Sequence, residues 1–399
     1  MIKKIIKLLM PLIIIITDLI SIIFRLLPKK NNLVIFGAMA GNYYGDNSKY
    51  VFEYMHRNNP ELNLVWMTRK KEIYEDLKER NLPVIFMYSF KSIIFLFRAK
   101  VGVYTNNLAD ISVFPTLAPS NLNLIALRHG RSVKKVRYAA AGKNISFSER
   151  YMIKKETNMI KAAISTSDFV SLIQEEVLKI GKEKHVVSGY PRNDALFKES
   201  NNEYLDSLTE KYKNIILYGP TWRHGESPVK FFPFEDMSAE DLNEVLIDNN
   251  ALMILRPHKN ELKNKIVSSQ IDELCKFSNF KMLGHDIVPS VNDLLPICDL
   301  LICDYSALYH DYLLLNRPLM MIPYDYEKVS KSRGFLYDYY DNAPGPIISS
   351  YKDFRLELLN VFQDIDNFIE NRNNLNNLIH KYQDSKSSSR VANLIIKNL

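Results

Sequence analysis

The chain has 399 residues, of which 47% are hydrophobic and 24% are charged, and its formal net charge is +7. This composition excludes a disordered chain, and the length suffices for two α/β domains of ordinary size. The three cysteines form no CxxC pair, which argues against a disulfide framework and structural zinc and indicates a reducing compartment. The modest positive charge fits an anionic substrate, an anionic membrane surface or nucleic acid.

The first 30 residues differ from the rest of the chain. Residues 8–24 are almost wholly apolar, but Pro11 and Asp18 interrupt the run, which is shorter than the ~20 residues of a spanning helix. Residues 1–30 are therefore predicted to form an amphipathic helix at a membrane interface, on the cytoplasmic face because lysines favour anionic lipid. A spanning helix and a buried helix are the alternatives. On a helical projection the polar residues share one narrow sector: Lys4, Lys7, Pro11, Asp18, Ser21 and Arg25.

After residue 30, short apolar runs alternate with stretches of helical periodicity. This alternation predicts mainly parallel, doubly wound sheets, and its two series predict two Rossmann-like domains that face a cleft. We expect domains at 31–188 and 189–351, separated at the turn-rich hexapeptide 189–194, and a helical segment 352–399 that closes against either domain. The expected strands are 33–36, 64–67, 84–87, 101–104, 122–127 and 163–165, then 215–218, 252–255, 300–303 and 319–322.

A basic loop follows the expected strand 122–127. It contains Arg128, His129, Gly130 and Lys134, and Gly130 gives the backbone freedom just past the strand end. A histidine here can accept a proton from an attacking hydroxyl, since imidazole titrates near working pH, while the cations neutralise phosphate. The alternative interpretation of the loop alone is a solvated basic segment or a nucleic-acid patch.

Three expected strands of the second series end in polar or basic residues. Because the carboxyl ends of parallel strands meet at the ligand-binding edge of a sheet, these side chains are predicted to converge there. Ser306 is also expected to be the N-cap of a helix over 307–316, where free N–H groups favour an anion. Cations and hydroxyls without a cluster of carboxylates suit a diphosphate held without metal. The residues are Thr221 and Arg223, Arg256 and His258, and Asp304 and Ser306.

These motifs, in this order, resemble those of the CDP-glycerol:poly(glycerophosphate) glycerophosphotransferases, the teichoic-acid primase and polymerase type. The resemblance covers about residues 120–350, and the ordered set is far more specific than any single motif. Two departures affect the expected polyol: Ala307 stands where the family has a second serine, and Lys259 where it has a proline. The matching motifs are HGxxxK at 129–134, GYPRND at 189–194, PTWR at 220–223, RPH at 256–258, DYS at 304–306, RGF at 333–335 and PGP at 344–346.

The resemblance implies a GT-B-like enzyme with an N-terminal acceptor domain, a C-terminal CDP-donor domain, no metal or other cofactor, and peripheral attachment to the cytoplasmic membrane face. It implies transfer of a polyol phosphate, glycerol phosphate first of all, from a CDP-activated donor to a hydroxyl of a lipid-linked or polymeric cell-surface glycan, with release of CMP. His129 and His258 are expected to be catalytic. Arg128, Gly130 and Lys134 are assigned to the acceptor or to charge neutralisation, and the donor phosphates to Thr221, Arg223, Arg256, Asp304 and Ser306.

Two other functions remain open from the sequence. A nucleotide-sugar glycosyltransferase of cell-surface polysaccharide synthesis has the same fold, but the PTWR, RPH and DYS set resembles the phosphotransferases. A membrane-tethered nucleic-acid-binding protein is disfavoured because the basic residues lie in one loop without a pattern of stacking aromatics. The polyol, the acceptor, the number of units added and the oligomeric state are not determined by the sequence.

Overall fold

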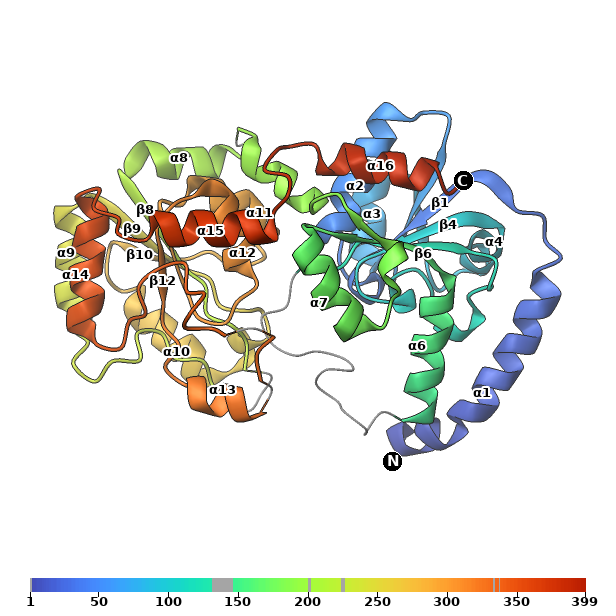
Figure 1. The fold of residues 1–399 in the computed structure, drawn as a ribbon, viewed down its shortest axis with the longest axis horizontal. Helices are drawn as coiled ribbons and strands as arrows, with labels where there is room; N and C mark the ends of the chain where they lie inside the picture. The colour runs from blue at the N-terminus through green and yellow to red at the C-terminus, as the bar shows by residue number, and fades with distance from the viewer. Residues whose placement is uncertain (1, 131–145, 200–201, 224–226, 333, 337) are drawn as a thin grey trace. The chain divides into compact units, whose positions relative to one another are not determined.

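The computed structural model describes residues 2–130, 146–199, 202–223, 227–332, 334–336 and 338–399. They form two compact α/β units (Figure 1), which confirms the prediction of two parallel-sheet domains. The described parts of the first unit are residues 2–130, 146–194 and 384–399. The second unit lies within residues 195–383.

The first unit contains a seven-stranded parallel sheet in the order β3-β2-β1-β4-β5-β6-β7. Its strands are continuous apolar runs because helices cover both faces, as the buried half of β1 shows. The order reverses between β1 and β4, the kind of position where open α/β sheets bind ligands. The strands are β1 Lys30–Phe36, β2 Asn63–Thr68, β3 Val84–Phe86, β4 Ala99–Tyr104, β5 Asn123–Ala126, β6 Ile160–Ser165 and β7 His185–Val187, and the helices are α1 Ile2–Phe24, α2 Asp46–Asn58, α3 Lys71–Glu79, α4 Phe90–Arg98, α6 Phe147–Met159, α7 Asp168–Leu178 and α16 Ser387–Ile396.

The second unit contains a five-stranded parallel sheet in the order β10-β9-β8-β11-β12. The strands β8, β9 and β11, whose polar ends were singled out above, are thus neighbours in one sheet. The strands are β8 Asn214–Tyr218, β9 Ala251–Leu255, β10 Phe280–Met282, β11 Leu300–Cys303 and β12 Leu319–Met321, and the helices are α8 Glu203–Lys211, α9 Ala239–Asp248, α10 Lys265–Leu274, α11 Val291–Leu294, α12 Leu308–Tyr312, α13 Tyr326–Ser332, α14 Tyr351–Phe362 and α15 Ile369–Ile379.

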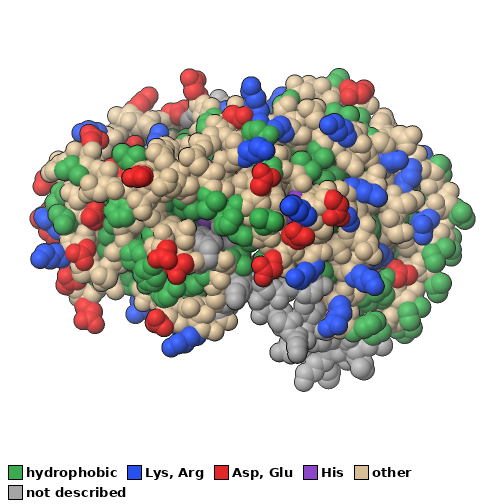
Figure 2. Space-filling view, viewed as in Figure 1, with side chains coloured by type: hydrophobic (Ala, Val, Ile, Leu, Met, Phe, Trp, Pro, Cys, Tyr) green, Lys and Arg blue, Asp and Glu red, His purple; other side chains and the backbone are tan. Residues whose placement is uncertain are grey.

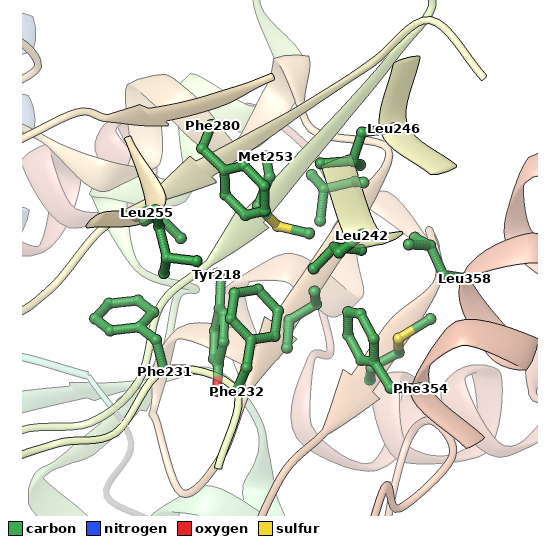
Figure 3. Close-up of a cluster of buried hydrophobic side chains, with 14 of the residues drawn as sticks. Tyr218, Phe231, Phe232, Leu242, Leu246, Met253, Leu255, Phe280, Phe354 and Leu358 are labelled. Carbon is green, nitrogen blue, oxygen red and sulfur yellow. The ribbon is translucent and has the colours of Figure 1, made fainter. Parts of the chain in front are cut away.

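An aromatic core lies under one face of this sheet (Figure 3). The ring of Tyr218, at the end of β8, meets Phe231 and Phe232 edge-on at 5.0 Å each, and Phe354 of α14 packs on Phe232. Burial of each such ring contributes about 1.5–3 kcal/mol. The core therefore fixes the end of β8, from which the loop to Arg223 departs.

The C-terminal residues belong to both units. Helices α14 and α15 lie in the second unit, whereas α16 lies beside α2 in the first (Figure 1), where Val391 and Ile395 join its core. The carboxylate of Asp194 accepts the N–H groups of Ser387 and Ser388, both at 2.8 Å. The predicted segment 352–399 is therefore divided, and the first unit extends to Asp194, past the boundary expected at 189.

The N-terminal segment forms the helix α1, and one of its faces packs on the first unit. Ile14, Thr17 and Ser21 are buried, Asp18 pairs with Tyr151 and Lys155 of α6, and Phe24 stacks on Phe97 at 5.0 Å. The polar stripe near Asp18 and Ser21 thus faces protein rather than water. No helix in the described ranges is long and apolar enough to cross a membrane.

The opposite face of α1 is apolar and exposed. Figure 2 shows hydrophobic side chains along the edge of the molecule where α1 runs. An apolar stripe of this length that the described residues leave exposed is typical of an interaction surface. The side chains, each at least 47% exposed, are Leu12, Ile15, Ile16, Leu19, Ile22, Ile23 and Leu26.

Candidate active site

His129 lies just past the end of β5, as predicted, and its ring contacts the first residue of α2. The Nδ1 atom of His129 makes a short hydrogen bond to the carboxylate of Asp46. The His129 side chain is 61% exposed, whereas that of Asp46 is only 3% exposed. An accessible imidazole is therefore held from below by a buried carboxylate.

Two further groups surround the Asp46 carboxylate. Arg192 lies 3.2 Å from Asp46 Oδ1, and the same Arg192 nitrogen donates to the carbonyl of His129 at 2.6 Å. The Asn47 N–H also donates to Oδ1, at 2.7 Å. Burial alone would raise the pKa of Asp46, but His129, Arg192 and the Asn47 N–H outweigh it and lower the pKa to about 2. Asp46 is thus ionised across the physiological pH range.

The backbone around His129 is unusual on both sides. Arg128 has φ +57° and Gly130 φ +119°, and Asn47 clamps the turn by donating to the carbonyls of Leu127 and Arg128. A Cβ at Gly130 would lie 2.6 Å from the Arg192 guanidinium in a conformation that only glycine adopts readily. Gly130 therefore has a structural reason to be glycine. Lys134 lies outside the described residues.

In the second unit, the structure changes the roles predicted for Arg223 and Asp304. Arg223 is 5% exposed and binds Asp325 through two nitrogens, at 2.7 and 2.9 Å, and Asp304 at 2.6 Å. Thr221 donates its N–H and its hydroxyl to Asp304. Burial alone would lower the pKa of Arg223, but the two aspartates raise it above its ordinary value. One guanidinium between two carboxylates cannot neutralise a phosphate, so this cluster holds the loops after β8, β11 and β12 together.

Arg256 is also occupied within the protein. It is 5% exposed, and its guanidinium donates to the carbonyls of Leu283, Gly284 and Val288 at 2.6–3.1 Å. The reason is geometric: the loop after β10 turns back over the end of β9 and presents its carbonyl oxygens to this cation. Arg256 therefore supports the 283–288 loop, and its role as a phosphate ligand stays a prediction.

His258 and Ser306 are half-buried at the same edge of the sheet, and Trp222, in the loop after β8, lies against His258. The rings of His258 and Trp222 stack at 5.2 Å, and the Asn260 N–H donates to His258 Nδ1 at 3.2 Å. Nδ1 is thus an acceptor, so in the neutral ring Nε2 carries the hydrogen. These residues offer a ligand an N–H, a hydroxyl and a flat aromatic surface.

The helix expected over 307–316 is shorter than predicted. It spans Leu308–Tyr312 as α12, continues as a 3₁₀ turn over Leu313–Leu315, and ends at Asn316 in the left-handed conformation. Ala307 takes the N-cap position, yet the Ser306 hydroxyl accepts the Leu308 N–H at 3.2 Å. Ser306 therefore does part of the predicted capping. Among the described residues no group of three His, Cys, Asp or Glu side chains could hold a metal ion.

Three functional-site residues were missed in the sequence: Asp46, Arg192 and Asp325. Arg192 lies inside the quoted 189–194 motif, and Asp46 sits between Gly45 and Asn47 at the start of α2. Those local signals mark a turn and a helix start. They carry no information about pairing with His129, 83 residues from Asp46, or with Arg223, 102 residues from Asp325.

Known proteins have sequences and folds similar to those of this chain. Residues 19–397 match the family described as CDP-glycerol:poly(glycerophosphate) glycerophosphotransferase. A teichoic acid glycerol-phosphate transferase of Staphylococcus aureus (strain NCTC 8325 / PS 47) is 27% identical over 390 residues, 94% of this chain and 96% of that protein. A teichoic acid poly(glycerol phosphate) polymerase of Bacillus subtilis (strain 168) is 28% identical over 82% of this chain, which spans 43% of the polymerase.

The structure of the wall teichoic acid polymerase TagF aligns with 98% of this chain and 97% of that chain, with a TM-score of 0.75 and 22% identity. Two doubly wound α/β units with this likeness define a GT-B-like fold. The chain belongs to the CDP-glycerol:poly(glycerophosphate) glycerophosphotransferase family. It is thus an enzyme that transfers a polyol phosphate, which confirms the resemblance and favours phosphate transfer over the two alternative functions.

The buried position of Arg223 gives a test of its role. Replacing it in Arg223→Met leaves Asp304 and Asp325 buried without a cation, which should destabilise the second unit by about 3–5 kcal/mol. Arg355→Met is the matched control, because Arg355 and its partner Asp241 are 45% and 40% exposed, and a surface pair contributes only about 0–1 kcal/mol. Calorimetric unfolding of both variants measures the difference. A normally stable Arg223→Met protein with weakened donor binding would instead show direct phosphate contact.

Proposed function

We propose that the enzyme transfers glycerol phosphate from CDP-glycerol to a hydroxyl of a lipid-linked or polymeric glycan acceptor and releases CMP. The observation that carries the proposal is a pair of imidazoles, His129 and His258, each held through Nδ1 just past a strand end, in a chain of this family. Similar proteins support glycerol phosphate: the Staphylococcus aureus transferase covers nearly the same length. One TagF structure was obtained after a soak with CDPG.

In this mechanism the acceptor oxygen attacks the phosphorus that bears the glycerol. A new bond forms between that phosphorus and the acceptor oxygen, and its bond to the bridging oxygen breaks. The bridging oxygen leaves as part of CMP. His129 takes the acceptor's proton on Nε2, and His258 donates an Nε2–H to the phosphate whose charge grows as CMP leaves. Ser306 adds a hydroxyl at the same edge.

A donor screen tests the proposed function. The purified enzyme is incubated with CDP-glycerol, CDP-ribitol or a UDP-sugar and a short soluble acceptor, and release of CMP or UDP is measured. We expect CMP release with CDP-glycerol, unaffected by EDTA because Arg128 and Lys134 of the basic loop are predicted to neutralise phosphate charge in place of a metal. Release of UDP or UMP from the UDP-sugar would contradict the proposal. Loss of activity in EDTA, with recovery on adding magnesium, would contradict a metal-free reaction.

His129→Ala tests the general base. Removal of the base should lower kcat by about 10²–10⁴-fold, while the protein folds normally because the His129 side chain is largely exposed. His56→Ala in the same unit is the control: His56 is exposed on α2 and lies outside the proposed machinery. CMP release under saturating donor is the measurement. Turnover of His129→Ala close to that of the unaltered enzyme would remove His129 from the mechanism.

His258→Ala and Ser306→Ala test donor binding. Loss of a hydrogen bond to a charged phosphate costs about 1.5–3 kcal/mol, so KM for CDP-glycerol should rise about 10- to 100-fold with little change in KM for the acceptor. Ser306→Ala also loses a helix-capping bond. Ser350→Ala is therefore its control, because Ser350 caps α14 with the same kind of bond to Asp353. Initial rates at varied donor and acceptor separate the two constants; equal rises in both would indicate a general structural defect.

The exposed apolar face of α1 supports attachment to the cytoplasmic face of the cell membrane. Leu19 and Ile23, at 58% and 66% exposure, lie on this face, and their burial in an acyl layer would be favourable. The helix packs on the unit through its other face, so in this proposal it lies on the bilayer and does not cross it. Anchoring would concentrate the enzyme near a lipid-linked acceptor.

Vesicle flotation with anionic lipid tests this attachment. Leu19→Glu with Ile23→Glu should abolish flotation yet leave CMP release with a soluble acceptor unchanged, because both side chains point away from the unit. Leu172→Glu, a comparably exposed site on α7, should float like the unaltered protein. High salt should release part of the bound protein. Retention through salt and carbonate washes would mean that the segment spans the bilayer.

A further inference from the structure

The hydrogen bond between Asp46 and His129 Nδ1 bears on which ring nitrogen of His129 is free to accept a proton. We propose that Asp46 is a positioning residue that fixes the tautomer and the orientation of His129 so that Nε2 is the atom that accepts the acceptor's proton. The proposal rests on the proposed function, in which His129 is the general base. It concerns residues of the first unit alone: α2, the loop after β5, and the 3₁₀ segment at Arg192.

The carboxylate selects the tautomer by its chemistry. An ionised carboxylate can only accept hydrogen bonds, so the Nδ1 atom that contacts Asp46 carries the hydrogen. In the neutral ring the lone pair is then on Nε2, the nitrogen on the side away from Asp46. When Nε2 takes a proton, the positive charge that forms on the ring lies next to a carboxylate already in place. That arrangement stabilises charge during the reaction without any movement of the protein.

The surroundings hold the carboxylate in one position. Both oxygens of Asp46 are engaged: Oδ2 by His129, and Oδ1 by Arg192 and the Asn47 N–H. Arg192 also holds the His129 carbonyl, so the same cation fixes the backbone and the carboxylate. Asp46 and Arg192 are thus the charged residues whose contacts with His129 fix it among the described residues.

Stability alone does not account for this arrangement. A contact between a 3% exposed carboxylate and a 61% exposed imidazole buries little apolar surface, while desolvation of the carboxylate is costly. Asp46 and Arg128 both adopt left-handed backbone conformations, at φ +57° each. Such conformations are unfavourable in non-glycine residues and concentrate at functional sites. The arrangement that exposes His129 to solvent therefore lowers the stability of the fold.

Nitrogen NMR on the unaltered enzyme is the first arm of the test. The ¹⁵N shifts of the imidazole ring distinguish the two tautomers, and comparison with His129→Ala assigns the signals. At a pH where the ring is neutral, we expect hydrogen on Nδ1 and none on Nε2. Hydrogen on Nε2 in the unaltered enzyme overturns the proposal, whatever the variants do.

Asp46→Asn is the second arm. Asparagine tolerates the left-handed conformation and nearly preserves the shape, but its amide is uncharged and can donate to Nδ1, which would place the hydrogen on Nε2. We expect kcat for CMP release to fall about 10²–10⁴-fold, as when an orienting carboxylate is replaced by its amide, with KM for CDP-glycerol little changed. The NMR signals of His129 should show loss of the Nδ1–H tautomer.

Glu156→Gln is the matched control, since Glu156 is another buried carboxylate of the first unit that accepts a hydrogen bond, from Tyr104. It should keep both kcat and the His129 tautomer. Asp46→Asn with unaltered kcat, or with reduced kcat but an unaltered tautomer, overturns the positioning role. His129→Ala separates the two hypotheses: if that variant remains active, the proposed base is wrong, whereas loss of activity there with a fully active Asp46→Asn defeats the positioning role alone.

Discussion

In each unit, a buried arginine paired with aspartate holds the loops that follow the strands in place. Arg192 holds Asp46 and the His129 carbonyl in the first unit, and Arg223 holds Asp304 and Asp325 in the second. A buried guanidinium is expensive unless it is paired, so each loop must close around its partners in one way. The accessible side chains on these loops are therefore held in one position.

The buried arginines stabilise the loops, whereas the accessible histidines are proposed to contact the substrate. Charged residues at strand ends are readily predicted to bind phosphate. In this structure, however, Arg223 donates hydrogen bonds to aspartate and Arg256 donates to backbone carbonyls. The imidazoles of His129 and His258, anchored through Nδ1 from opposite chemical partners, differ in the nitrogen that bears hydrogen. A carboxylate partner leaves a base, and a backbone N–H partner leaves a donor. In the proposed mechanism, histidine thus supplies both the base and the hydrogen-bond donor.

The sequence was sufficient for most of the strands and for the residues at their ends, but the short strands β7 and β10 were not predicted. Runs such as Leu300–Cys303 are apolar without alternation because both faces are covered, and the turn after each run places His129, His258 and Ser306 at the carboxyl edge. The direction in which a long side chain points was not predictable, because it depends on partners distant in sequence, such as Asp325 for Arg223. The polar stripe of α1 was similarly recognised, but its contact with Tyr151 and Lys155 was not.

The return of α16 to the first unit affects the order in which the protein can be completed during synthesis. Helix α16 contributes Val391, Ala392 and Ile395 to the core that contains Val51 and Met55 of α2. The carboxylate of Asp194 accepts hydrogen bonds from the N–H groups of Ser387 and Ser388. Residues 195–383 are made before that helix, so the second unit can close while the first still exposes the apolar surface that α16 covers. The complete core of the first unit therefore requires a helix that follows the whole second unit in the sequence.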